Sequence, residues 1–120
     1  MSHVKNIFSK LIVNLIHSLS YSPDGQIIAT GGLDGKIRLW DTKSYMCFST
    51  MSEHSTKVTG IAFTSRANTV VSSSLDGTIK AYDTKKYRCF RTFKPDLAAQ
   101  FNCVIVNFTF NNFEGFLNLF

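Results

Sequence analysis

The sequence has little that would support catalysis or metal binding. It contains three histidines and three cysteines among 120 residues. No CxxC pair occurs, and no histidine lies at metal-ligand spacing from a Cys, Asp or Glu cluster. There is no Gly-x-Ser-x-Gly nucleophile motif. The glycine-rich stretch at 31–35 is not followed by a predicted helix start, so it does not predict a phosphate-binding loop. These absences argue against an enzyme, and we expect no cofactor, no bound metal and no small-molecule substrate.

Acidic residues are absent before Asp24, and the stretch from Ile7 to Leu19 is rich in apolar residues. Lys10 and His17 interrupt it, so it is too short and too polar for a transmembrane helix. No small-residue cleavage site follows, which argues against a secretory signal. The apolar positions follow a helical spacing, so one interpretation is an amphipathic targeting helix. The stretch contains no arginine, which favours the other interpretation, a local packing segment without membrane contact.

The composition fits one packed domain, with 44% hydrophobic and 18% charged residues. Lys and Arg outnumber Asp and Glu by 13 to 8, a formal charge of +5. This balance indicates either contact with nucleic acid or another acidic surface, or simply a soluble basic domain. Cys47, Cys89 and Cys103 are odd in number, and the first two fall at equivalent repeat positions. We interpret these two as small apolar strand residues in a reducing compartment.

An internal repeat is the strongest signal in the chain. A shift of 42 residues aligns two segments without gaps. The matched positions are Leu33-Asp34-Gly35 with Leu75-Asp76-Gly77, Ile37 with Ile79, Trp40 with Tyr82, Asp41-Thr42-Lys43 with Asp83-Thr84-Lys85, and Tyr45, Cys47 and Phe48 with Tyr87, Cys89 and Phe90. A period of about 40 to 45 residues is that of a β-propeller blade.

Each unit predicts four short antiparallel strands. Those of the first are Leu19–Ser22, Gln26–Thr30, Lys36–Trp40 and Tyr45–Met51, with a Pro23-Asp24-Gly25 turn and a loop at 31–35. Those of the second are Val58–Phe63, Thr69–Ser73, Thr78–Tyr82 and Tyr87–Phe93. The predicted fold is all-β, a partial propeller of two four-stranded blades and the start of a third.

The segments Leu19–Gly25 and Gly31–Asp41 resemble the consensus of the WD-repeat family. The resemblance implies a hydrogen-bonded chain of a histidine, a strand Ser or Thr, a turn Asp and a strand aromatic in each blade. The second unit supplies His54, Ser72, Asp76 and Tyr82, with tyrosine in place of the usual tryptophan. The first supplies Thr30, Asp34 and Trp40, and Ile12 stands at its histidine position. We therefore expect the first blade to be the weaker one.

A narrower resemblance links the chain to the periodic tryptophan protein 2 family. It rests on the segments Cys47-Phe48, Glu53–Ser55, Val58–Gly60, Ser72–Lys80, Tyr87–Phe93 and Gln100–Cys103, within about residues 18–107. It implies a non-catalytic scaffold in the nucleolus that assembles the small-subunit processome and helps process the ribosomal RNA precursor. Its partners would be other proteins of a large ribonucleoprotein assembly. The alternative is a generic WD adaptor in a vesicle-coat, ubiquitin-ligase or chromatin complex, with a cytoplasmic location.

The expected organisation has five parts. Residues 1–13 are a divergent N-terminal segment, 14–52 the first blade and 53–94 the second. Residues 95–107 form the first strand of an incomplete third blade, and 108–120 a divergent Phe- and Asn-rich tail. We expect the chain to be a truncated or mis-spliced product of a longer gene. Two blades leave edges and apolar faces uncovered, so we expect aggregation, self-assembly or a need for further blades or a partner.

A basic stretch in the second unit is the candidate contact surface. Its members are Lys80, Lys85, Lys86, Tyr87, Arg88, Arg91 and Lys94, with Phe90 and Phe93 interleaved. Basic groups neutralise phosphates and aromatic rings stack on bases, so RNA is one candidate ligand and an acidic protein partner the other. The alternative is that both phenylalanines are buried, which strand alternation favours, and that the charges form a solvated edge.

Overall fold

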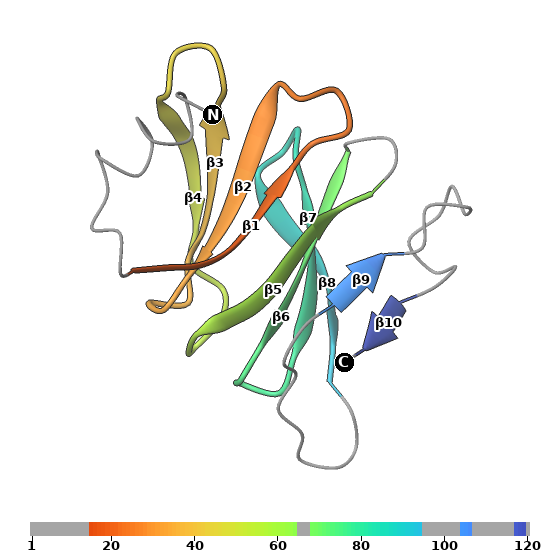
Figure 1. The fold of residues 1–120 in the computed structure, drawn as a ribbon. Coiled ribbons are helices and arrows are strands. Elements are labelled where there is room, and N and C mark those ends of the chain that lie inside the picture. The colour runs from red at the N-terminus through yellow and green to blue at the C-terminus, as the bar shows by residue number, and fades with distance from the viewer. Residues whose placement is uncertain (1–14, 65–67, 95–103, 107–116, 120) are drawn as a thin grey trace.

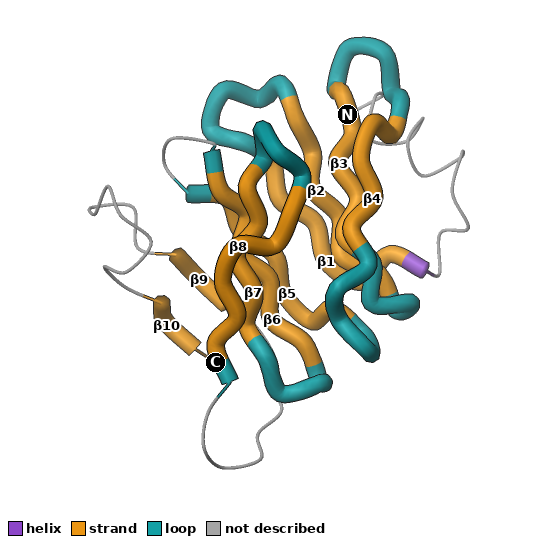
Figure 2. The backbone as a smooth tube through the Cα atoms, turned by 180° about the vertical axis from the view of Figure 1, so that it is seen from behind, coloured by secondary structure: helices purple, strands orange, loops and turns teal. Residues whose placement is uncertain are grey.

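The computed structural model describes residues 15–64 and 68–94, together with the backbone of two short strands at 104–106 and 117–119. Every element there is a strand, apart from one helical residue at Leu15 (Figures 1 and 2). The first sheet consists of β1 (Ile16–Tyr21), β2 (Ile27–Gly32), β3 (Ile37–Asp41) and β4 (Cys47–Met51). The second consists of β5 (Val58–Phe63), β6 (Thr69–Ser74), β7 (Ile79–Asp83) and β8 (Arg88–Phe93). The all-β prediction is confirmed.

The two sheets have the same topology and register. Each is an antiparallel meander in which strands adjacent in sequence pair with one another. Ile28 pairs with Trp40 in the first sheet, and Val70 pairs with Tyr82 in the second. A β-bulge interrupts the outermost pairing of each sheet at the same place, before Trp40 and before Tyr82. These matches, 42 residues apart, show that the two sheets are equivalent blades.

The turns between strands explain where the strands end. In the Pro-Asp-Gly turn, Gly25 has φ 72° and donates its N–H to the Ser22 carbonyl at 2.9 Å. Gly35 and Gly77 occupy the same position in their blades, with φ of 80° and 86°. The predicted loop at 31–35 is too long, because Gly31 and Gly32 still pair with β1. The loop therefore begins at Leu33.

The main core lies between the two blades. Strand β5 packs against β1 and β2, which brings the second sheet face to face with the first (Figure 1). The buried members of this core are Ala29, Ile37, Leu39 and Met51 from the first blade and Val58, Ile61, Phe63, Val70 and Tyr82 from the second. The approach is close at Gly31, where an added Cβ would lie 2.4 Å from Val58 Cγ1. Burial of apolar surface between blades is thus what holds the pair together.

The ends of the chain are described only in part. Ile16 and Leu19 lie in β1, so the helical interpretation of the apolar spacing is wrong for these two positions. Residues 7–14 of that stretch, including Ile12, lie outside the described residues. Strand β9 (Val104–Val106) lies beside β5 and β6 and pairs antiparallel with β10 (Leu117–Leu119). No strand was predicted at 117–119, because that segment has no turn signal before it.

The expected burial of two phenylalanines is wrong. Phe90 is 47% exposed and Phe93 36%. Phe90 is the extra residue of the β8 bulge, which disturbs the alternation on which that prediction rested. Phe93 has Met51 as its equivalent, and Met51 is buried because the second blade covers it. Phe93 lies on the opposite, outward face of the second blade, where no full sheet of the described residues covers it.

Candidate functional site

A buried hydrogen-bonded chain joins three segments of the second blade. His54 comes from the connection between β4 and β5, Ser72 from β6, and Asp76 from the turn after β6. The Asp76 Oδ2 atom lies 2.9 Å from His54 Nδ1, and Ser72 Oγ lies 2.6 Å from His54 Nε2. Because the carboxylate can only accept, Nδ1 carries the proton and Nε2 accepts from the serine hydroxyl. The chain therefore ties the entry into the blade to its second strand.

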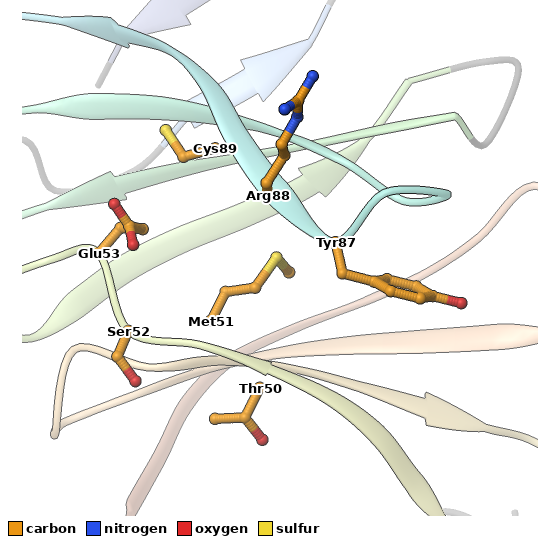
Figure 3. A pocket seen from close by; sticks show the side chains of 7 residues that line it. All are labelled: Thr50, Met51, Ser52, Glu53, Tyr87, Arg88 and Cys89. Atoms are coloured by element: carbon orange, nitrogen blue, oxygen red, sulfur yellow. The ribbon is translucent and has the colours of Figure 1, made fainter.

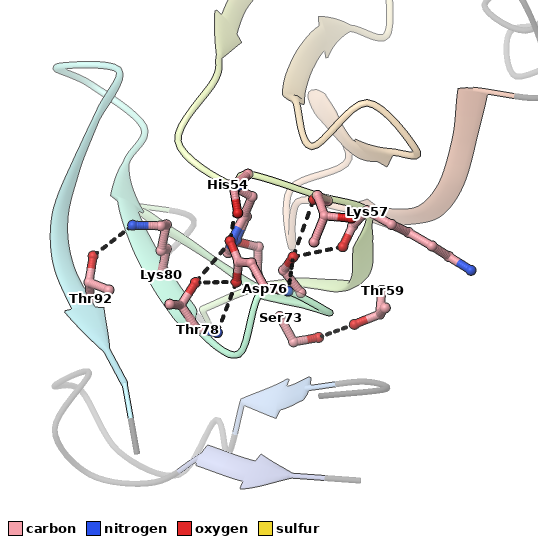
Figure 4. Close-up of polar contacts among 12 residues, drawn as sticks. His54, Lys57, Thr59, Ser73, Asp76, Thr78, Lys80 and Thr92 are labelled. Carbon is pink, nitrogen blue, oxygen red and sulfur yellow. Dashed lines mark hydrogen bonds and ion pairs between the residues drawn. The ribbon is translucent and has the colours of Figure 1, made fainter. Parts of the chain in front are cut away.

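Asp76 collects further donors around its turn. Thr78 donates its N–H at 2.9 Å and its hydroxyl at 2.6 Å (Figure 4). Ser55 donates its N–H at 3.1 Å. Burial acts to raise the pKa of Asp76, but the hydrogen bonds from Thr78 and His54 outweigh it. The pKa falls from 3.8 to about 2. Asp76 is therefore ionised in the folded protein at neutral pH.

His54 is neutral in this arrangement. Its side chain is fully buried, and burial lowers its pKa below 6.5, although the neighbouring Asp76 carboxylate acts in the opposite direction. Burial disfavours the charged imidazolium, and the Ser72 hydroxyl already uses Nε2 as an acceptor. The His54–Asp76 contact is thus a hydrogen bond rather than an ion pair.

We predict that the folded state loses stability in two steps on acidification. The folded pKa of His54 is below its unfolded value of 6.5, so its contribution is complete above pH 6.5 and declines below it. The Asp76 contribution is complete above its unfolded pKa of 3.8 and declines toward pH 2. Because water screens part of the site, we expect about 1–2 kcal/mol from this second step. Urea unfolding from pH 8 to pH 2.5 measures both. In His54→Gln the first step should vanish; an unchanged slope below pH 6.5 would contradict this assignment.

The aromatic end of the chain differs between the blades. In the first blade, Trp40 Nε1 donates to Thr30 Oγ1 at 3.0 Å. In the second, the Tyr82 hydroxyl is buried and has no hydrogen-bond partner. Burial raises the pKa of Tyr82, and the nearby Ser72 hydroxyl offsets part of this rise. The two hydroxyls do not have the geometry of a hydrogen bond. The replacement of tryptophan by tyrosine therefore leaves a donor unsatisfied.

We predict that Tyr82→Phe stabilises the second blade. The substitution removes a buried hydroxyl without a partner and keeps the ring in the core, so we expect a gain of about 1 kcal/mol. Chemical denaturation followed by circular dichroism measures the change. Thr30→Val in the first blade is the matched control, because it removes the acceptor of an existing bond and should destabilise. A loss of stability in Tyr82→Phe would show that the hydroxyl is bonded in solution.

The first blade holds its turn aspartate in a different way. Asp34 Oδ2 accepts from Arg38 at 2.9 Å, and Asp34 Oδ1 accepts from the Lys36 N–H at 3.2 Å. Burial acts to raise the pKa of Asp34, but these bonds lower it. Its side chain is 25% exposed, against 8% for Asp76. A partly solvated ion pair thus stands where the second blade has a buried network.

The side chains of Ser72, His54 and Asp76 are hydrogen-bonded in the same sequence as a nucleophilic triad, but a substrate cannot reach the serine. Ser72 is fully buried, so no substrate can reach its hydroxyl. Among the described residues, no group of three His, Cys, Asp or Glu side chains could hold a metal ion. The helical content of the described part of the chain is also too small for any helix to cross a membrane. The geometry indicates a structural role for the network.

A groove at the outer edge of the molecule is open to solvent. It runs between β4 and β8, where residues 50–53 face residues 87–89, and its volume is about 240 Å³ (Figure 3). Met51 reaches from β4 toward β8, whereas the Arg88 guanidinium points away from β4. The Glu53 carboxylate makes one wall polar, whereas the Thr50 and Ser52 hydroxyls point away from β8. The groove can therefore accept a polar chain but is too open for enclosed chemistry.

An aromatic contact joins the two blades at this groove. The rings of Phe48 and Tyr87 meet edge to face, with centroids 5.9 Å apart and an interplanar angle of 67°. Both remain exposed, at 42% and 47%. Tyr87 has φ 55°, as its equivalent Tyr45 has φ 61°, because each ends the tight turn between the last two strands. Such backbone angles are uncommon outside glycine.

The basic residues predicted as contacts lie on β7, on β8, in the turn between these strands and directly after β8. The Lys80 ammonium donates to Thr92 at 3.0 Å across the β7–β8 ladder. The Arg91 guanidinium lies 5.9 Å from the Phe93 ring centroid. Lys85 and Lys86 lie in the turn before Tyr87, where Asp83 accepts both main-chain N–H groups at 2.7 and 3.0 Å. Lys80 is half-buried. The other predicted contact residues are exposed: Lys85, Lys86, Tyr87, Arg88, Arg91 and Lys94.

Three contributors were not predicted from the sequence. Thr78 bonds to Asp76, Arg38 neutralises Asp34, and Phe48 pairs with Tyr87. Thr78 has Lys36 as its equivalent, so the repeat does not mark it. Phe48 does match Phe90 in the repeat, but its contact with the other blade depends on how the blades pack. Of the three residues, only Phe48 had a signal in the sequence, namely its match with Phe90 in the repeat.

The fold and the network define the class of protein. Residues 12–41 and 45–83 match the WD domain, G-beta repeat family, which covers more than half of the chain. The chain belongs to the WD-repeat family. It is also similar to periodic tryptophan protein 2 homologs: 46% identical over 77% of its length to that of Dictyostelium discoideum, and 56% identical over 34% to that of Mus musculus. The chain spans about a tenth of the first relative and 4% of the second.

Proposed function

We propose that the chain acts as a non-catalytic scaffold in small-subunit processome assembly and ribosomal RNA precursor processing in the nucleolus. The observation that supports this most is the 46% identity to a periodic tryptophan protein 2 homolog, sustained over 94 residues. That span reaches well beyond a single WD repeat. The proposal extends to this chain what the resemblance implies for that family.

The structure of the blades is consistent with a role in binding. The network of His54, Ser72 and Asp76 is buried and serves to fix strands, whereas the strands with most exposed side chains are the outer strands β4 and β8. Rigid strands that present exposed aromatic and basic side chains suit contact with other macromolecules. Protein partners within a ribonucleoprotein assembly, with RNA contact in addition, follow from this arrangement.

The second candidate is a WD adaptor in a vesicle-coat, ubiquitin-ligase or chromatin complex. It is supported by the family match alone, because WD blades of this kind occur in proteins with different partners. The segment Tyr87–Phe93 distinguishes the two candidates, since it contributes to the narrower resemblance. Location distinguishes them as well, because only the first predicts a nucleolar protein.

Affinity purification of the tagged gene product from its own cells tests the proposal. We expect small-subunit processome proteins and precursor ribosomal RNA to co-purify, and the tagged protein to concentrate in the nucleolus. The double variant Arg88→Glu, Arg91→Glu is included because both side chains are exposed, and reduced recovery would assign the contact to β8. Co-purification with coat, ubiquitin-ligase or chromatin proteins instead would overturn the proposal in favour of the second candidate.

A further inference from the structure

Each blade exposes an aromatic ring at a β-bulge in its last strand. Phe48 and Phe90 are the extra residues of equivalent bulges, and both are exposed, at 42% and 47%. The β4 strand is followed by a complete second blade, so a missing neighbour does not explain the exposure of Phe48. A bulge re-aims a side chain, and here it directs an aromatic ring outward in both blades.

At the groove, the ring of Phe48 meets a ring of the next blade. Tyr87 contacts Phe48 edge to face, and together the two rings form an exposed apolar patch between β4 and β8. Met51, 5% exposed, lies at the base of the same groove. Exposed aromatic rings beside a nearly buried apolar side chain are typical of the anchor point of an interface.

The charge around the Phe48–Tyr87 pair is asymmetric. Lys85 and Lys86 precede Tyr87, and the Asp83 carboxylate is occupied by their main-chain N–H groups. Neither lysine side chain forms an ion pair among the residues described at 15–64 and 68–94. Glu53 lies on the other wall of the groove. The end next to the aromatic pair is therefore cationic, and the opposite wall carries one carboxylate.

We infer that this groove is a docking site for an acidic, extended peptide segment of a partner protein. An apolar side chain of the segment contacts Phe48 and Tyr87, its carboxylates face Lys85 and Lys86, and its main chain runs along the β4 wall toward Glu53. Glu53 disfavours an RNA backbone along the same path, because phosphates would approach a fixed negative charge. A peptide can instead offer an N–H group to Glu53. The inference rests on the proposed function only in that the chain works by binding partners.

Fluorescence anisotropy with short labelled peptides tests the site on the full chain. The probe is a glutamate-rich peptide with a central Phe-Leu pair; its lysine-rich counterpart and an oligo-uridine RNA of equal charge are the comparisons. We expect the acidic peptide to bind most tightly. Tyr87→Ser and the pair Lys85→Glu, Lys86→Glu should each weaken it by about fivefold or more, the effect of an interface anchor.

Two matched variants serve as controls. Phe90→Ser removes an equally exposed ring at the equivalent bulge, and Lys43→Glu reverses the charge equivalent to Lys85 in the first blade. Both should leave the affinity unchanged, and circular dichroism confirms that each variant is folded. Tighter binding of the RNA or the lysine-rich peptide, or an equal loss in the controls, would overturn the inference. Recovery of processome components by the Tyr87→Ser protein would then leave the proposed function standing.

Discussion

Asp76→Ala should destabilise the second blade by about 3 kcal/mol or more, the largest effect of any single side-chain truncation considered. The substitution removes the acceptor for His54 Nδ1, for the Ser55 N–H and for both donors of Thr78. A buried donor left without a partner costs about 1–3 kcal/mol, and His54 Nδ1 would keep only its longer contact with Thr78 Oγ1 at 3.2 Å, with no access to water. The loss should therefore exceed that of one ordinary hydrogen bond.

Asp34→Ala is the matched control in the first blade. It occupies the same turn position, but its partner is Arg38 and its side chain is 25% exposed. Ion pairs in contact with solvent contribute about 0.2–1 kcal/mol, so a loss of about 1 kcal/mol is expected. Urea midpoints followed by circular dichroism compare the two variants. Equal losses would mean that the buried network stabilises the fold no more than a surface ion pair does.

Gly35→Ala should cost about 3 kcal/mol, because this glycine lies where the two blades meet. Its φ of 80° already disfavours an alanine by about 1–2 kcal/mol. An added Cβ would also lie 2.5 Å from the His54 carbonyl oxygen and 3.0 Å from that of Thr56. Both contacts are to backbone, so relief requires that the segment carrying His54 move away from the first blade, at an overpacking cost of about 1–3 kcal/mol.

Gly25→Ala separates the two causes. Gly25 has φ 72°, similar to that of Gly35, but an added Cβ would meet nothing within 4 Å. This variant should therefore lose only the conformational part, about 1–2 kcal/mol. Trp40, the single tryptophan, reports on the first blade by fluorescence, and circular dichroism reports on both. If the two glycine variants were equally stable, the close approach of the blades at Gly35 would be excluded.

The repeat carried most of the fold prediction. Residues 42 apart recur at positions where the strand pattern demands the same side chain, so the eight strands of the two blades were located to within a few residues. The blade network was equally accessible, because His54, Ser72 and Asp76 follow from the family pattern. The structure adds the hydrogen-bond distances within this network. It also shows that the Tyr82 hydroxyl has no hydrogen-bond partner.

What sequence could not predict depends on packing between the sheets and on local irregularities. The bulge at Phe90 breaks the alternation that predicted its burial, and no residue type marks a bulge of this kind. The groove exists because the second blade places Tyr87 beside Phe48 across the interface. A contact between residues 39 positions apart in different sheets has no periodic signal.

The two sheets pack as adjacent blades, with β5 against β2 at Gly31. A nuclear Overhauser measurement between the Gly31 Hα protons and the Val58 methyl groups tests this arrangement most directly. We expect a strong cross-peak, since a Cβ in place of one Hα would lie 2.4 Å from Val58 Cγ1. If the Val58 methyl groups instead showed contacts only to residues of the second sheet, the blade-on-blade arrangement would be contradicted.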